Sequence, residues 1–93
     1  MKAIFNGQVI ADSDATVIVE GNHYFPPESI KQAFFKPSGL QTVCHWKGTA
    51  SYYSLEAKGK TASDAAWYYP EPSEAAANIK NHVAFYKDIV ELK

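Results

Sequence analysis

The sequence predicts a mainly β protein, a small antiparallel domain with about eight strands and one or two short helices. Its apolar and β-branched residues occur in short runs, several of which alternate with polar residues as half-buried strands do. Turn-forming residues separate the runs at intervals of roughly 8–12 residues, as in sandwiches and folded-over sheets. Two tryptophans, six tyrosines and five phenylalanines supply a large aromatic core for 93 residues. No repeat or linker interrupts the chain, so we expect residues 1–93 to form one domain.

The chain opens with a predicted hairpin. The runs Lys2–Phe5 and Gln8–Asp12 have the composition of strands. Asn6-Gly7 between them is a strong hairpin signal, because both central residues of a type I′ turn need a positive φ. A third run, Thr16–Glu20, is nearly all β-branched and predicts a strand that ends at Gly21.

Two prolines mark the next change of structure. Pro26-Pro27 end the extended segment before them, and Pro27 suits the first turn of a helix, which we expect over Glu28–Phe35. Alternation then predicts a strand over Leu40–Trp46, with Cys44 and Trp46 on the same face.

Four further elements complete the expected fold. A turn at Lys47-Gly48 leads into a strand over Thr49–Lys58, and another strand covers Ala65–Tyr69. A short helix is predicted over Ser73–Ile79, which has a cap residue and three alanines. The last strand, Val83–Leu92, is long and apolar enough to be central.

Charge and cysteine content narrow the function classes. The net charge of −1, with Lys and Glu interspersed, argues against a nucleic-acid binder or an anionic-membrane binder. A single cysteine rules out an internal disulfide and suits a reducing compartment. The first residues contain no long apolar run, so we expect neither a secretory signal nor a membrane span. We therefore expect a cytoplasmic location.

The ten residues from Cys44 to Tyr53 hold the strongest candidate for chemistry. They combine the unique thiol with an imidazole, an ammonium, an indole and two phenols. As a catalytic thiolate, Cys44 needs a nearby cation such as Lys47. Residues 44 and 47 leave opposite faces of a regular strand, so this contact requires a bend, which Gly48 permits. A buried structural thiol is the competing interpretation.

The same stretch favours a small-molecule site. We expect Trp46, Lys47, Tyr53 and Trp67 to form a pocket around Cys44, in which rings stack on the ligand and the ammonium pairs with an anionic group. Adjacent tyrosines in a strand point to opposite faces, so at most half of them share one surface. The aromatic residues equally suit a core, and both interpretations remain open.

Metal and acid–base chemistry are not indicated. The cysteine and the three histidines lack the spacing of a zinc site, and the aspartates fall at turns or strand ends. No nucleophile-elbow motif is present either. We therefore predict no metal and no cofactor.

Five sequence blocks carry a family resemblance. They are NGQVIADS at 6–13, YFPPE at 24–28, TVCHWKGTASYY at 42–53, AAWYYP at 65–70 and VAFY at 83–86. In this order they resemble a small bacterial family known as domain of unknown function 427, over nearly the whole chain. His45 stands where that family usually has proline, which predicts a slightly different turn.

The resemblance implies a β-tent-like fold, similar to that of methionine sulfoxide reductase type B. Such relatives often bind zinc through four cysteines, which this chain does not have. The reductases place a catalytic cysteine on the sheet, which is an analogy for Cys44 at the level of the fold. A nucleotidyltransferase label is sometimes attached to the family, but no Gly-Ser loop followed by paired aspartates is present here.

Three functional hypotheses follow. The first is a small-molecule-binding protein that uses the aromatic, Lys and Cys pocket. The second is a thiol-dependent enzyme, redox or nucleophilic, in which Lys47 holds the Cys44 thiolate and Tyr52 or Tyr53 orients the substrate. The third is a non-enzymatic interaction module or homodimer that uses exposed tyrosines and an edge strand. Binding is favoured, because no second catalytic group stands at a suitable spacing.

Overall fold

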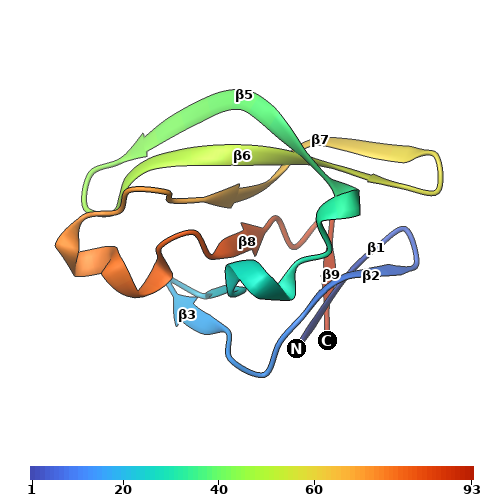
Figure 1. Ribbon diagram of the computed structural model, residues 1–93, viewed down its shortest axis with the longest axis horizontal. Coiled ribbons are helices and arrows are strands. Elements are labelled where there is room, and N and C mark those ends of the chain that lie inside the picture. Colours follow the sequence, from blue (N-terminus) through green and yellow to red (C-terminus); the bar gives the residue numbers. More distant parts are fainter.

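The computed structural model describes all residues from 1 to 93 and confirms the mainly β class. Its strands are β1 (Lys2–Phe5), β2 (Gln8–Asp12), β3 (Val17–Val19), β4 (Asn22–Tyr24), β5 (Phe35–Cys44), β6 (Gly48–Ala57), β7 (Lys60–Tyr68), β8 (Val83–Phe85) and β9 (Glu91–Leu92). They form three antiparallel sheets, ordered β2-β1-β9, β3-β4 and β5-β6-β7-β8 (Figure 1). None of the helices is long and apolar enough to span a membrane.

The first hairpin forms as the sequence predicts. Asn6 and Gly7 have φ angles of 49° and 76°, which are the two positive values that a type I′ turn needs. The Asn6 side-chain amide also donates a hydrogen bond of 2.9 Å to the Ala57 carbonyl oxygen. This contact ties the hairpin to the end of β6. β9 pairs with the other edge of β1, so the two chain ends lie side by side (Figure 1).

A second tight hairpin joins β3 and β4. The predicted strand Thr16–Glu20 shortens to β3, and the chain turns at Glu20 and Gly21, whose φ angles are 52° and 79°. The sequence predicts an extended segment before Pro26 but not its pairing with β3 as a separate strand, β4. The turn has glutamate, a rare residue at a positive φ, where Asn or Asp usually precedes the glycine. The usual sequence signature of a hairpin turn is therefore missing.

The predicted helix Glu28–Phe35 is wrong. Two 3₁₀ turns, η1 (Pro27–Ser29) and η2 (Gln32–Phe34), occupy this segment instead. Ile30 between them is extended, with φ −89° and ψ 145°, and it forms an isolated β-bridge with Ala11. Its buried side chain joins the core, and the amide of the next residue, Lys31, donates a hydrogen bond of 2.8 Å to the Ile10 carbonyl oxygen of β2.

The second predicted helix occurs as η3 (Glu74–Ile79), a 3₁₀ helix that Ser73 precedes. The predicted strand Val83–Leu92 is wrong, because the chain turns after β8 and reaches a different sheet in β9. Hydrogen bonds from the Ile89 and Val90 amides to the Tyr86 carbonyl oxygen close this turn. The nine observed strands therefore include β8 and β9, two short strands in place of one central strand.

Two hydrophobic clusters cover opposite faces of β6 and β7. Tyr53 and its cross-strand partner Ala66 belong to the larger cluster, whereas Tyr52 and its partner Trp67 belong to the smaller one. The adjacent tyrosines therefore point to opposite faces, as strand geometry requires. The larger cluster is built around the buried residues Phe5, Phe25, Phe35, Leu55 and Phe85, and the smaller around Tyr24, Tyr52, Tyr69, Ile79 and Ala84.

Candidate functional site

The β5–β6 hairpin carries the predicted site at its tip. The predicted strand Leu40–Trp46 corresponds to the second half of β5, which ends at Cys44. Residues 45–47 form the turn, and β6 begins at Gly48, the cross-strand partner of Cys44. Gly48 has a φ of 116°, a conformation that favours glycine. The turn brings Lys47 back to the face of the sheet that carries Cys44, which a regular strand would not do.

Lys47 is the most unusual residue at this tip, because it is charged and only 7% exposed. Its ammonium forms an ion pair with the carboxylate of Glu20, the residue at the positive φ of the β3–β4 turn. The same nitrogen lies 5.2 Å from the ring centroid of Trp46 and 5.7 Å from that of Tyr69. A carboxylate and two aromatic faces thus compensate the charge that burial would otherwise penalise.

These contacts set the protonation states. Burial tends to lower the pKa of Lys47, but the Glu20 hydrogen bond and the nearby Tyr24, Tyr69 and Cys44 groups outweigh it and raise the pKa. The hydrogen bond from Lys47 and its charge lower the pKa of Glu20. Burial raises the pKa of Tyr69 to about 12 despite the adjacent ammonium. The ion pair and the neutral Tyr69 phenol are therefore the stable forms at neutral pH.

The structure brings four of the five predicted site residues to one side of the sheet. Cys44 is a partly buried free thiol that packs against the smaller cluster, close enough to Lys47 to contribute to its raised pKa. Trp46 flanks the Lys47 ammonium and is 41% exposed. Trp67 packs on the same cluster, and its indole N–H donates a hydrogen bond of 3.2 Å to the Tyr24 hydroxyl.

Tyr53, the fifth predicted residue, lies on the opposite face. It stacks on Tyr68 with ring centroids 4.6 Å apart and meets Phe35 edge-on at 5.5 Å. Burial and the proximity of Tyr68 raise the pKa of Tyr53. The sheet therefore separates Tyr53 from Cys44, Trp46, Lys47 and Trp67.

The loop that follows β7, which includes Glu71 and Ser73, is hydrogen-bonded to the hairpin tip. The Ser73 amide donates a hydrogen bond of 2.9 Å to the Lys47 carbonyl oxygen, and the Ser73 hydroxyl donates another to the Trp46 carbonyl oxygen. A Cβ atom on Gly48 would lie only 3.3 Å from the Glu71 carbonyl oxygen. The glycine thus allows the loop to approach β6 closely, and the two hydrogen bonds hold it there.

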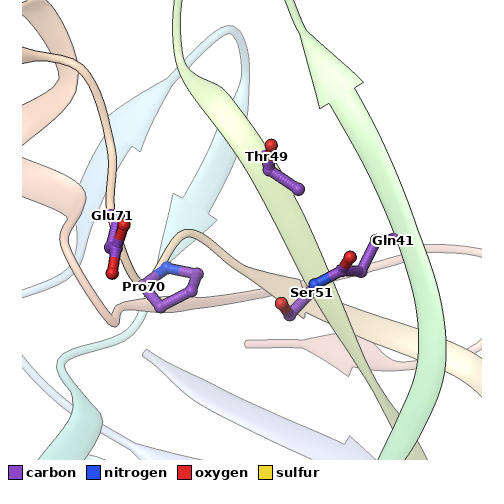
Figure 2. Close-up of a pocket in the computed structure, with 5 residues that line it drawn as sticks. All are labelled: Gln41, Thr49, Ser51, Pro70 and Glu71. Carbon is purple, nitrogen blue, oxygen red and sulfur yellow. The ribbon is translucent and has the colours of Figure 1, made fainter.

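A cavity of about 310 Å³ opens beside this loop, on the face of the sheet opposite to Cys44. Figure 2 shows Pro70 and Glu71 of the loop on one side and the side chains of the two strands on the other. The lining consists of Gln41 from β5, Thr49 and Ser51 from β6, and Pro70 and Glu71 from the loop. None of the predicted site residues lines it.

Polar groups dominate the cavity lining. Two hydroxyls, one carboxamide and one carboxylate face it, and no lysine or arginine does. The sequence alone gave little sign of this site, since Gln41, Thr49 and Ser51 look like ordinary outward-facing strand residues. Their alignment depends on the cross-strand pairing of Gln41 with Ser51, and the position of Glu71 depends on contacts with residues far away in the chain.

No group of three or more His, Cys, Asp or Glu side chains is arranged to hold a metal ion.

No curated protein matches the sequence significantly. A family model described as a domain of unknown function (DUF427) matches residues 1–93, the whole chain. The protein therefore belongs to the DUF427 family.

Proposed function

We propose that this protein binds a small polar molecule in the cavity between the β5–β6 hairpin and the loop at Pro70-Glu71. The observation that carries the proposal is a cavity of about 310 Å³ lined by four polar side chains on a backbone that is held in place. This volume lies at the lower end of the range of about 300–1,000 Å³ typical of ligand sites, which suits a small metabolite.

The lining also indicates the charge of the ligand. Glu71 contributes the only charged group, so an anion would meet repulsion while an amine would gain a charge-assisted hydrogen bond. The hydroxyls of Thr49 and Ser51 and the carboxamide of Gln41 both donate and accept hydrogen bonds. A neutral or cationic molecule with several hydroxyl or amino groups satisfies this set.

In this proposal Trp46 and Lys47 do not contact the ligand but support the loop that lines the cavity. Their carbonyl oxygens accept the hydrogen bonds from Ser73 that hold the loop, and the Lys47 side chain is itself fixed by Glu20. A ligand anion that paired directly with Lys47 would have to displace the Glu20 carboxylate. Direct binding at Trp46, Lys47, Tyr53 and Trp67 is the competing arrangement, and the experiment below separates the two.

The test is a thermal-shift screen against small amines, polyols and carboxylates. For each compound that stabilises the wild type, Thr49→Val and Glu71→Gln should reduce the shift strongly, because each removes one polar contact. Thr61→Val is the matched control, since Thr61 is exposed at the far end of β7. If Lys47→Met abolishes the shift while Thr49→Val and Glu71→Gln leave it unchanged, the ligand binds beside Lys47 and Trp46 and the proposal fails.

A second candidate function is thiol chemistry at Cys44. It is favoured by the position of the Lys47 ammonium on the same side of the sheet as the partly exposed thiol. A neighbouring ammonium stabilises a thiolate, which is the nucleophilic form. Native protein should then react with iodoacetamide, and Lys47→Met should slow the reaction. A thiol that reacts only after denaturation would refute this candidate.

A further inference from the structure

One edge of the four-stranded sheet has no partner. β5 pairs only with β6, and Figure 1 shows its other edge at the outside of the molecule. The five residues 39–43 are all exposed, although alternate side chains point to opposite faces. Neither face of this stretch is therefore fully covered by the rest of the chain.

The exposed stretch includes apolar surface. Val43 is 77% exposed, the highest value among the large hydrophobic residues of the chain, and Leu40 is 41% exposed. Trp46, in the turn that follows, is exposed to the same degree as Leu40. Three of the six exposed large hydrophobic residues thus fall within seven positions of one hairpin.

The second half of β5 also lacks the features that normally block edge pairing. The first half contains Lys36, Pro37 and an irregular register up to Gln41, all of which hinder the addition of another strand. From Gln41 to Cys44 the register with β6 is regular, and the stretch contains no proline and no charged residue. A strand without charge can pair with a copy of itself without bringing like charges together.

We propose that the second half of β5 pairs antiparallel with the same segment of a second copy of this chain, with residues 42–44 centred on Val43, so that the two Val43 side chains lie next to each other at the axis. Antiparallel pairing of identical edges creates a two-fold axis, so the assembly closes as a dimer rather than growing into a fibre. It satisfies the free backbone groups of both edges and covers Val43 on each copy. The pairing also places the second copy beside Gln41, at the rim of the polar cavity.

The experiment compares the molecular mass in solution of the wild type and three variants over a concentration series up to about 1 mM. The wild type should show a reversible monomer–dimer equilibrium. Val43→Lys and Val43→Glu should each raise the dissociation constant at least about tenfold, because like charges then face each other across the axis. An equimolar mixture of these two variants should recover the dimer, since opposite charges now meet.

Ile18→Lys is the matched control, because Ile18 on β3 is 63% exposed and lies outside β5. It should dimerise like the wild type, and all variants should keep the unfolding temperature of the monomer. The proposal is overturned if the wild type stays monomeric throughout the series. It is equally overturned if Ile18→Lys disrupts the dimer while both Val43 variants preserve it, because a different surface would then be responsible.

Discussion

At the scale of single residues, Lys47 links three segments that are distant in the sequence. Its side chain connects the β3–β4 turn through Glu20, the end of β7 through Tyr69 and its own hairpin through Trp46. A fixed cation next to the unique thiol was predicted from the sequence, together with the need for a bend at Gly48. Glu20 was not, because the chain gives no sign that residues 20 and 47 meet.

The Glu20–Lys47 pair predicts a pH-dependent stability at the acidic end. The pKa of Glu20 is lower in the folded protein, so its stabilising effect is complete above the ordinary glutamate value of 4.5. It is lost as the pH falls through the folded value. Glu20→Gln should therefore lower the unfolding temperature at pH 7, and the difference from the wild type should shrink as the pH falls below 4.5 and through the lower folded value.

The control is Glu56→Gln, which changes an exposed glutamate outside any ion pair. It should leave the unfolding temperature nearly unchanged at neutral and at acidic pH. A Glu20→Gln variant as stable as the wild type at pH 7 would show that the ion pair contributes nothing to folding.

At the alkaline end, Tyr69 predicts a late ionisation. Burial raises its pKa to about 12, above the ordinary tyrosine value of 10. The neutral phenol therefore stabilises the fold fully below pH 10, and this contribution disappears as the pH rises towards 12. In an ultraviolet titration of the phenolates, Tyr69→Phe should remove the latest-ionising group. If the last part of the titration is unchanged in the variant, Tyr69 is not in the environment described.

At the scale of elements, tight turns with positive φ angles account for much of the successful prediction. Asn6-Gly7 correctly predicts the strands on either side of it, because this residue pair favours the positive φ angles of a hairpin turn whatever its distant contacts. Prediction failed where a distant contact determined the local structure. Ile30 is extended because it bridges to Ala11, and the segment 83–92 is divided because β9 joins β1 in another sheet. Neither partner can be inferred from a local pattern.

Gly48 provides the test at this scale. Its φ of 116° and the Glu71 oxygen at 3.3 Å from a hypothetical Cβ both oppose a side chain. Gly48→Ala should therefore destabilise the protein by about 1–3 kcal/mol, measured by urea unfolding. Gly39→Ala is the matched control in the same hairpin, because its Cβ would meet nothing within 4 Å and its φ is not positive. It should change the stability by less than about 1 kcal/mol. Equal effects of the two substitutions would refute the close approach of the loop.

At the scale of the whole molecule, the sheet separates two environments. On one face the Lys47 ammonium packs among Glu20, Trp46 and Tyr69, and the other face carries the polar cavity. The sequence singles out Cys44, Trp46 and Lys47 of the first environment, because cysteine, lysine and tryptophan are chemically distinctive and lie close together in the chain, but it also includes Tyr53, which lies on the other face. It did not predict the second, since Gln41, Ser51 and Glu71 come from three segments that only the fold aligns.

The most direct test of the proposed binding site is an NMR titration of the backbone amides with the best ligand from the thermal-shift screen. We predict saturable shifts centred on residues 41, 49, 51 and 71, which line the cavity, and only small changes at the Trp46 indole N–H. Saturable shifts centred on the Trp46 indole and the Lys47 amide, with residues 41, 49, 51 and 71 unaffected, would contradict the proposal.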